Sequence, residues 1–326
     1  MNPKPRCKSA IVCTVISCIL AILSNQAHSA TARPLRIAFL FTSGTMASMW
    51  MAQETGAFAK EGLDVEMISM SSTLALPALL ANEVDAIQIS AVPLINASLR
   101  GFDPVFVAGM LNTMVWDLYA RPEIKSPEQL RGKIGGTERP GSPVAYGTLT
   151  ALNKLGLTAK DVQLRILGGS AQITAALLTG QIVAGAASPP VNFQLDRAGF
   201  HSMATTLDQP YQNVGVVVRR SRIDELANRL VPLLRAVRTG IDRYYSDKPF
   251  AIKVIGKYTR ESDADFLERT YEFFRKAGFR RDLMISASGI QGILDFLSET
   301  VPEAKRAAPA QFFDDRLLRQ LNARDR

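Results

Sequence analysis

Cysteine is nearly absent from the sequence, and its position restricts the chemistry of the protein. The three cysteines, Cys7, Cys13 and Cys18, all lie within the first 30 residues. The rest of the chain therefore cannot form a disulfide framework, a thiolate nucleophile or a thiolate metal site. Histidine is also scarce, because His201 is the only one after residue 30. It lies in the segment AGFHSM, where we expect a surface loop.

Catalytic and cofactor motifs are missing too. The sequence has no Gly-x-Ser-x-Gly elbow, no P-loop and no cluster of metal-ligating residues. The segments GGT (135–137) and GSP (141–143) lack the glycine spacing of a dinucleotide-binding loop. An enzyme would have to rely on scattered carboxylates, which any protein has. We therefore predict that the protein is not an enzyme and that it uses no cofactor and no metal.

The first 30 residues contain no Asp or Glu. The basic start MNPKPRCK precedes an apolar run of fifteen residues (9–23) and a short segment of small and polar residues. This order is typical of a secretory signal, and the run is shorter than the roughly 20 residues of a membrane span. We expect a signal peptide over residues 1–30, cleaved after Ser29 or Ala30, and a periplasmic protein. Alternatively, VISC ending at Cys18 matches a lipobox loosely and would anchor a lipoprotein.

Neither sign of charge dominates the remaining residues. Three of the 38 Lys and Arg residues and none of the 30 Asp and Glu residues precede residue 31, which leaves a net charge of +5. The pairs Arg219–Arg220 and Arg280–Arg281 are more typical of solvated surfaces than of phosphate contacts. We therefore predict no nucleic-acid partner. The composition, 47% hydrophobic and 21% charged, is that of a globular protein, and the length fits about two domains.

A segment of nineteen residues occurs twice. SAQITAALLTGQIVAGAAS (170–188) matches STLALPALLANEVDAIQIS (72–90) at a constant offset of 98 residues, with six identical positions. Chance similarity between Ala- and Leu-rich helices is the alternative interpretation. Strand and helix patterns around both copies follow the same order, however, which favours two copies of a βαβαβ unit. Such alternation predicts an α/β fold with a mostly parallel sheet in each of two lobes.

The expected elements follow from hydrophobic periodicity and from capping residues. Pro77 lies within one expected helix and indicates that this helix is short or kinked. In the first unit we expect strands at 35–41, 63–69 and 84–90 and helices at 45–62 and 72–83. In the second unit we expect strands at 133–137, 161–167 and 182–188 and helices at 141–157 and 170–181. Later helices, which we expect to pack onto a lobe that is already formed, cover 222–245, 263–278, 287–299 and 310–321.

Six segments in the same order resemble one family over nearly the whole chain after the signal. The sequence is similar to periplasmic substrate-binding proteins of the nitrate/sulfonate/taurine class of ABC transporters, which includes relatives that bind thiamine-pyrimidine precursors. The segments that carry the resemblance are MAQETGAFAKEGLDVEM (51–67), ALLANEVDAIQIS (78–90), IKSPEQLRGKIGGT (124–137), GSPVAYGTLTALNKLGL (141–157), AALLTGQIVAGAASPP (175–190) and FFDDRLLRQL (312–321).

The resemblance implies a type II periplasmic-binding-protein-like fold, in which two α/β lobes enclose a ligand cleft and two hinge crossings join them. Lobe I would comprise residues 33–116 plus 213–326, and lobe II residues 117–212. The crossings would lie near 114–120 and 211–218. One departure from the family pattern is Val183, where the second repeat usually has an acidic residue; the first repeat keeps Asp85. We expect this change to affect packing more than ligand chemistry.

Ligands of open parallel sheets bind beyond the carboxyl ends of the strands. Helix N-termini at these ends offer free N–H groups and a partial positive charge, which favours an anion. The ligand-binding residues predicted on this basis are Ser43, Gly44, Thr45, Met46, Ser72, Thr73, Ser90, Ala91, Trp116, Thr137, Arg139, Gly141, Ser142, Ser188, Pro189 and Asn192.

Each of these side chains also has a purely structural interpretation. Ser72, Ser142 and Ser170 can serve only as helix caps, and Arg139 can be a solvated loop residue rather than a bidentate anion partner. Met46 can form an apolar cleft wall or pack into the core, where we expect Met49 and Trp50. Trp116 can cover a ligand or support the hinge, and Tyr146 is a weaker candidate of the same kind.

The resemblance implies an exported solute-binding protein of an ABC importer. It would be a monomer that captures a small anionic organic ligand, of the sulfonate or carboxylate type, and delivers it to a membrane permease with its cytoplasmic ATPase. One alternative is an enzyme on the same bilobal fold, of the pyrimidine-precursor synthase or dehydratase type. The other is a sensory accessory protein that presents its ligand to a receptor.

Overall fold

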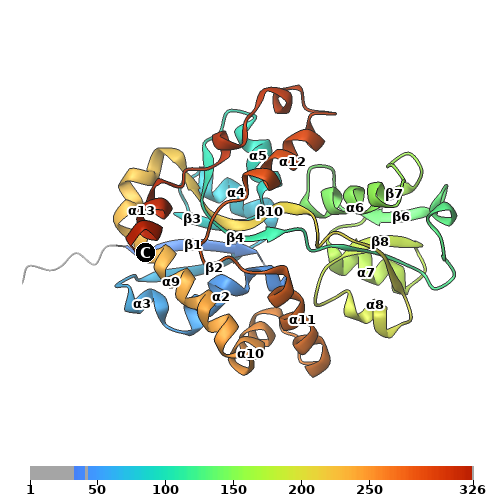
Figure 1. Cartoon of the computed structure of the whole chain (residues 1–326), viewed down its shortest axis with the longest axis horizontal. Helices are drawn as coiled ribbons and strands as arrows, with labels where there is room; N and C mark the ends of the chain where they lie inside the picture. The colour runs from blue at the N-terminus through green and yellow to red at the C-terminus, as the bar shows by residue number, and fades with distance from the viewer. Residues whose placement is uncertain (1–32, 41–42, 325–326) are drawn as a thin grey trace, which may run out of the picture. The chain divides into compact units, whose positions relative to one another are not determined.

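Two five-stranded sheets form the framework of the computed structural model, which describes residues 33–40 and 43–324 (Figure 1). The chain from Leu35 onward forms one compact unit. The predicted signal peptide, its cleavage site and the lipobox cysteine lie outside the described residues. Among the residues that the structure describes, no helix is both long and apolar enough to cross a membrane.

The first sheet has the strand order β2-β1-β3-β10-β4. Strands β1 (Leu35–Leu40), β2 (Val65–Met70) and β3 (Ala86–Ile89) are parallel, while β10 (Pro210–Arg219) runs antiparallel between β3 and β4 (Pro104–Thr113). Four of the five strands therefore run in one direction. β1 and β3 are almost entirely buried, because helices cover both faces of this sheet (Figure 1).

The second sheet repeats this order as β7-β6-β8-β5-β9. Strands β6 (Ile134–Thr137), β7 (Gln163–Ile166) and β8 (Ala184–Ala187) are parallel, and β5 (Asp117–Ala120) runs antiparallel between β8 and β9 (His201–Thr205). The predicted fold class, two α/β lobes with a mostly parallel sheet in each, is confirmed. His201 begins strand β9 rather than lying in the expected loop, because its backbone pairs with Ala120.

The repeat in the sequence is a repeat in the structure. Helices α4 (Ser72–Leu80) and α7 (Ser170–Leu178) begin and end 98 residues apart, as do β3 and β8. Two residues after each helix the backbone enters the left-handed region, at Asn82 (φ 59°) and at Gly180 (φ 73°). This conformation is typical of helix C-termini and suits Asn and Gly best. Pro77 lies inside α4, which is short as expected.

Two connections join the sheets. One runs from β4 to β5 through residues 114–116, and the other runs from β9 to β10 through residues 206–209. Each connection leads from an outer strand of one sheet to the antiparallel strand of the other. The segment 211–218, predicted as a crossing, lies within β10 of the first sheet. For the two lobes we keep the proposed bounds, 33–116 plus 213–326 for lobe I and 117–212 for lobe II.

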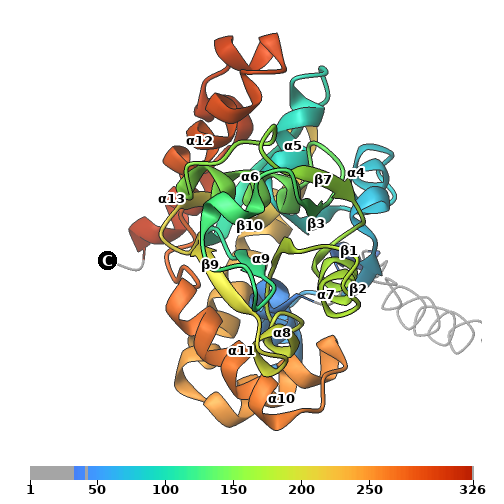
Figure 2. The same ribbon diagram turned by 90° about the vertical axis from the view of Figure 1, so that its right-hand side faces the viewer.

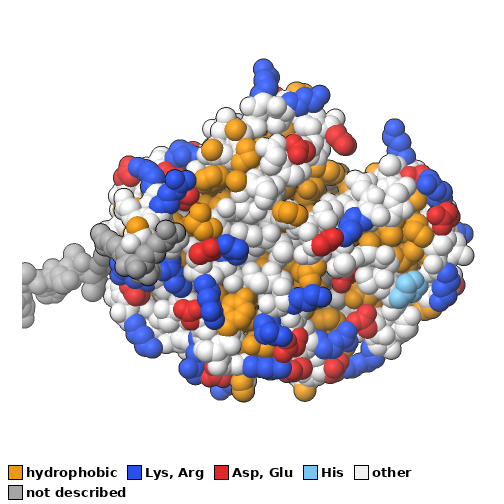
Figure 3. All heavy atoms as spheres, viewed as in Figure 1, with side chains coloured by type: hydrophobic (Ala, Val, Ile, Leu, Met, Phe, Trp, Pro, Cys, Tyr) orange, Lys and Arg blue, Asp and Glu red, His pale blue; other side chains and the backbone are white. Residues whose placement is uncertain are grey.

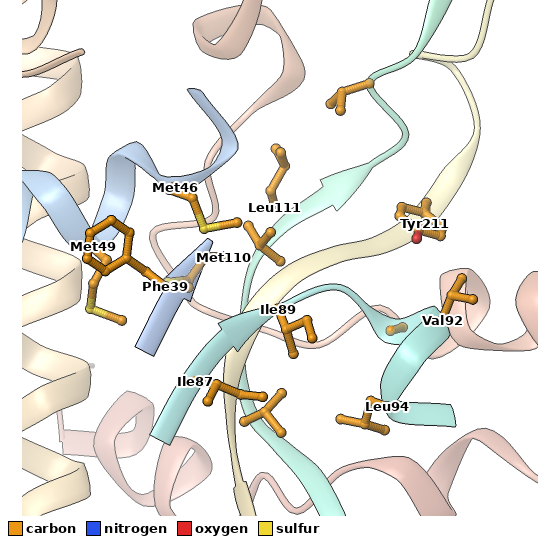
Figure 4. Packing of buried hydrophobic residues seen from close by; sticks show 14 of the residues in the cluster. Phe39, Met46, Met49, Ile87, Ile89, Val92, Leu94, Met110, Leu111 and Tyr211 are labelled. Carbon is orange, nitrogen blue, oxygen red and sulfur yellow. The ribbon is translucent and has the colours of Figure 1, made fainter. Parts of the chain in front are cut away.

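The helices after residue 220 pack onto lobe I. Gly240 allows α9 (Ile223–Ser246), the longest of these helices, to approach α2 (Ala47–Glu54) closely. A Cβ at position 240 would lie 2.5 Å from the backbone nitrogen of Ala52. Met49 and Trp50 are fully buried as expected, and Trp50 stacks on Tyr258 with ring centroids 4.8 Å apart. Figure 4 shows part of this core, with Met49 beside Phe39 and with Ile87 and Ile89 projecting from β3. These helices are α9 (Ile223–Ser246), α10 (Lys248–Thr259), α11 (Ala264–Ala277), α12 (Ala287–Leu297) and α13 (Arg316–Arg324).

Two of the helix predictions in this region were incomplete. Helix α10 was not predicted, because Pro, Gly and β-branched residues weaken its pattern; it begins where Asp247 accepts a hydrogen bond from the Phe250 backbone. The predicted helix 310–321 is instead a short 3-10 turn, η5 (Pro309–Phe312), followed by α13. Between them Phe313 bridges to Phe106 of β4, so pairing with the sheet interrupts the helix.

Basic and acidic side chains are intermixed on the face of the molecule shown in Figure 3. Among the described residues, ion pairs at the surface include Lys154 with Asp208 and Lys257 with Glu54. Exposed pairs of this kind contribute little to stability individually. The excess of positive charge in the sequence is therefore not gathered into one basic patch on this face.

Candidate ligand-binding cleft

A cavity of about 500 Å³ lies between the two lobes, at the carboxyl ends of their parallel strands. From lobe I it is lined by the last residues of β1, β2 and β3, namely Leu40, Met70 and Ile89, and by the loops that follow. Lobe II contributes the loops 138–144, 169–172 and 188–191. The first connection contributes Val115 and Trp116, and strand β10 contributes Asn213 and Val214. The cavity thus lies where an open α/β sheet binds its ligand.

Serine residues stand at the helix N-termini that border this cleft. Ser43 precedes the 3-10 turn η1 (Gly44–Met46), and Ser71 and Ser90 are the N-caps of α4 and α5 (Ala91–Ser98). Helices α5, α6 (Pro143–Lys154) and α7 are each eight residues or longer, so each presents free backbone N–H groups and a partial positive charge. Both lobes therefore direct positive helix ends at one cavity.

The hydroxyl groups in lobe II have partners as well as access to the cleft. Ser142 Oγ accepts a hydrogen bond from the Ala145 backbone at 3.1 Å and so caps α6 while it lines the cavity. Ser170 Oγ accepts from the Ser188 backbone at 3.2 Å and lies 3.3 Å from Ser188 Oγ. These bonds fix the hydroxyl oxygens, and each hydroxyl can still donate or accept one more hydrogen bond.

The structure brings most of the predicted residues to the cavity. Ten of the predicted ligand-binding residues, from five separate segments of the chain, line it. These residues are Ser43, Thr45, Met46, Ser90, Trp116, Arg139, Gly141, Ser142, Ser188 and Pro189. The side chains of Ser72 and Thr73 lie outside the described residues.

Four predicted residues do not line the cavity. Gly44 packs against α11, because a Cβ at this position would lie 2.3 Å from the Phe274 ring. Ala91 is fully buried, and Thr137 is buried at the end of β6. Asn192 is buried too and donates from Nδ2 to the Tyr119 hydroxyl at 3.1 Å. These residues are therefore not among the described residues that line the cavity.

Trp116 supports the hinge and lines the cleft at once. Its ring packs edge-on against Tyr211 with centroids 5.8 Å apart, and it lies so close to Gly147 that a Cβ there would be 2.8 Å away. Tyr146 stacks on Tyr211 with ring centroids 5.6 Å apart but does not line the cavity. Burial raises the pKa of Tyr146 to about 12 and that of Tyr211 further, so both stay neutral.

Glu138 and Arg139 are the charged residues in the described lining of the cavity. Arg139 is exposed and Glu138 is half-buried. The sequence predicted Arg139 but not Glu138, Gln172 or Asn213, because nothing in a loop sequence shows which of its residues face inward. The rest of the lining consists of serine and threonine hydroxyls, backbone groups, and apolar side chains such as Met46 and Val144.

Asp85 and Val183 occupy equivalent places in the two repeats, and neither lies at the cleft. The Asp85 carboxylate is buried, accepts from the Arg36 backbone nitrogen at 3.0 Å, and pairs with Arg222 Nη1 at 3.0 Å. Val183 packs partly buried against the core. At this place lobe II therefore has an apolar side chain where lobe I has a buried carboxylate, and the change takes no group from the cleft lining.

A family model described as "NMT1/THI5 like" matches residues 44–249. The chain belongs to this family. The match covers both connections between the sheets and both repeats apart from strand β1, so it includes every described residue that lines the cleft except Leu40 and Ser43. A comparison with curated protein sequences found no match.

Solved structures of periplasmic binding proteins share the fold of this chain. The aliphatic sulphonate binding protein SsuA from Escherichia coli has a TM-score of 0.73 at 18% identity, covering 87% of this chain and 92% of that protein. The alkanesulfonate-binding protein SsuA from Xanthomonas axonopodis pv. citri, bound to MOPS, has a TM-score of 0.70 at 17% identity, covering 90% and 99%. The nitrate-binding protein NrtA from Synechocystis PCC 6803 has a TM-score of 0.72 at 13% identity, covering 90% and 89%. Identities this low show the fold and leave the ligand open.

Proposed function

We propose that the protein is an exported solute-binding protein of an ABC importer. It captures a small anionic organic molecule, of the sulfonate or carboxylate type, between its lobes and delivers it to a membrane permease. The observation that carries this proposal is the convergence of helix N-termini from both lobes on one cavity of about 500 Å³. The solved relatives that bind sulfonates or nitrate support it.

The cleft suits a ligand with an anionic head. The N-termini of α5, α6 and α7 favour negative charge, and Ser90, Ser142 and Ser170 place hydroxyl groups beside them. An acid group with several oxygens can accept hydrogen bonds from these donors and from free backbone N–H groups at the same time. Arg139 lines the cavity, is exposed, and adds a positive charge.

The apolar part of the lining suits an organic tail. Met46, Met70, Ile89, Val144 and Val214 line the cavity together with Trp116. A bare inorganic anion would leave this surface in contact with water, whereas a hydrocarbon or aromatic group would bury it at a gain of about 25 cal/mol per Å². The combination of an apolar wall with polar helix ends therefore favours an organic acid over nitrate.

Thermal unfolding with a ligand panel tests the proposal. The panel contains taurine, alkane- and arylsulfonates, aromatic carboxylates, nitrate, bicarbonate and pyrimidine precursors. A ligand at about 100 times its dissociation constant stabilises the folded state by roughly 2.7 kcal/mol and raises the melting temperature by a few degrees. We expect a selective shift with an organic sulfonate or carboxylate, and recovery of that compound unchanged. A shift with nitrate alone would contradict the ligand class, and conversion of the compound would indicate an enzyme.

The identity of the neighbouring genes distinguishes a role in import from a sensory role. An importer requires a permease and an ATPase, which we expect to be encoded beside this protein. Binding of the purified permease complex to the ligand-loaded protein then tests delivery. A loaded protein that binds a receptor domain and no permease would support ligand presentation instead.

A further inference from the structure

Helix α8 (Phe193–Arg197) of lobe II and helix α11 of lobe I lie side by side (Figures 1 and 2). On α8 the residues Phe193, Asp196 and Arg197 are spaced so that they share one face. On α11 and its N-cap, Asp263, Phe266 and Arg269 recur every three residues and share one face in the same way. We call these six residues the clasp.

The ring contacts of the clasp join one lobe to the other. Arg197 lies over the Phe266 ring at 4.2 Å from its centroid, and Arg269 lies over the Phe193 ring at 4.1 Å. The two rings are 6.1 Å apart between centroids. The arrangement is reciprocal, because each lobe supplies one arginine and one phenylalanine. Cation–π contacts of this geometry are attractive and are stronger when they are shielded from water.

Two ion pairs reinforce these contacts. Arg197 Nη1 lies 2.8 Å from Asp263 Oδ2, and Arg269 forms an ion pair with Asp196. Asp263 also accepts a hydrogen bond from the Phe266 backbone at 3.1 Å, which caps α11 and holds the carboxylate in place. Each arginine therefore contacts a ring and a carboxylate of the opposite lobe at once.

The lobe II side of the clasp is continuous with the cleft wall. Residues 188–191 line the cavity, and α8 begins two residues later. Between them Asn192 is buried and hydrogen-bonds to Tyr119 of β5. Only one residue therefore separates the cleft loop from α8.

The lobe I side reaches the opposite cleft wall. Phe274 of α11 packs directly against Gly44, and Ser43, Thr45 and Met46 on either side of this glycine line the cavity. The buried hydroxyl of Tyr244 donates to the Tyr271 carbonyl at 3.0 Å and so ties α11 to α9. Both cleft walls thus rest on the helices that form the clasp.

We propose that the clasp is a closure device, which holds the lobes together and transmits the position of the cleft loops to the opening of the cleft. When the lobes separate, all four Arg contacts are lost together, so opening is cooperative. This inference does not depend on the identity of the ligand. It predicts that the clasp sets the ratio of closed to open molecules even in the free protein.

Distance measurement between spin labels tests this proposal without a ligand. Because all native cysteines lie in residues 1–30, the full chain with these three changed to serine accepts labels at two exposed lysines, Lys60→Cys in lobe I and Lys160→Cys in lobe II. In free protein we expect Asp196→Arg and Arg269→Asp each to lower the closed-to-open ratio by about tenfold. The double exchange, Asp196→Arg with Arg269→Asp, restores the pair in reverse and should return most of the closed population.

Arg275→Asp is the matched control. Arg275 lies on the same helix, but its partner Glu272 also belongs to α11, so this change should leave the distance distribution unaltered. Circular dichroism checks that each variant folds, and Arg269→Gln replaces any charge-reversed variant that does not. The proposal is overturned if the single variants leave the distribution unchanged, if the double exchange is as open as the singles, or if Arg275→Asp opens the lobes equally.

Discussion

The helix and strand α4 and β3 of the first repeat have the same bounds as α7 and β8 of the second at an offset of 98 residues, yet the two lobes stabilise them differently. In lobe I the residue before β3 is Asp85, a buried carboxylate that pairs with Arg222 and so ties the repeat to the start of α9. In lobe II the equivalent Val183 makes no ion pair. The backbone elements that both repeats have in common form the cleft. The side chains that differ between the repeats, such as Asp85 and Val183, determine how strongly each repeat is tied to the rest of the protein.

The cleft loops differ in the same way. In lobe I the loop at Gly44 rests on Phe274 of α11 and has no space for another atom. In lobe II the glycine of the equivalent strand-to-helix loop, Gly141, has a left-handed backbone (φ 77°) and only Asn96 within reach. We therefore expect lobe I to be the firmer wall, because α11 of the C-terminal region packs against its cleft loop.

The largest expected effect comes from copying the lobe II residue into lobe I. Asp85→Val leaves the half-buried Arg222 and the Arg36 backbone nitrogen without this carboxylate, which should destabilise the protein by about 3 kcal/mol. Urea denaturation measures the change. The reverse substitution, Val183→Asp, breaks no existing pair and should cost clearly less. Equal losses in the two variants would show that the Asp85 pair has no special role.

A smaller effect is expected from adding one methyl group to each cleft loop. Gly44→Ala forces the new Cβ into the Phe274 ring and should destabilise the fold by about 2 kcal/mol through overpacking. Gly141→Ala places its Cβ 3.3 Å from Asn96 Nδ2, which requires only a small shift of that side chain, and adds the cost of a left-handed alanine, about 1 kcal/mol. Thermal unfolding of both variants gives the order. If Gly141→Ala is the more destabilising, lobe I is not the firmer wall.

Removal of a helix cap separates stability from binding. Ser142→Ala loses the bond to the Ala145 backbone, and Ser286→Ala loses an equivalent cap on α12, away from the cleft. Both should destabilise the protein by about 1 kcal/mol. Only Ser142→Ala should also weaken binding of the best panel compound, by about tenfold. Titration calorimetry measures this, and an equal affinity loss in Ser286→Ala would mean that binding follows stability alone.

The smallest effect concerns contacts between the lobes rather than within one. Hydrogen bonding to Arg197 lowers the pKa of Asp263 below its usual value. Because the pKa is lower in the paired state, this contribution is complete above about pH 4 and is lost as the pH falls through the depressed value. The distance between the labelled lobes should therefore stay constant from pH 8 to pH 5 and increase below about pH 4. In the variant Arg197→Gln, the increase in distance that arises from protonation of Asp263 should disappear. If the distance depends on pH in this variant as it does in the wild-type protein, Asp263 is not the source of the increase.

Much of this architecture could be predicted from the sequence, because hydrophobic periodicity and the 98-residue offset are local properties of the chain. The strands β1, β2 and β3 and their counterparts in lobe II appeared where their apolar runs predicted them. Loops at strand ends then brought Ser43, Ser90 and Ser142 to one cavity. The family relationship followed from the same segments.

The remaining features depend on tertiary contacts that leave little trace in the sequence. Asn192 is polar and close to the cleft in sequence, yet Tyr119 holds it inside the lobe. Gly44 suggested close approach to a ligand, whereas the close neighbour is Phe274 from the far end of the chain. The break between η5 and α13 arises from pairing of Phe313 with Phe106. Each of these outcomes is decided by a partner more than 70 residues away in the sequence.

The most direct test of the cleft as an anion site is calorimetric titration of the wild-type protein and of Ser142→Trp with the panel compound that shifts unfolding most. An indole at position 142 occupies the cavity at the N-terminus of α6. We predict binding of one molecule per chain in the wild-type protein and loss of at least 100-fold in affinity in the variant, about 2.7 kcal/mol. Unchanged affinity in a folded Ser142→Trp protein would contradict the assignment of the ligand to this cleft.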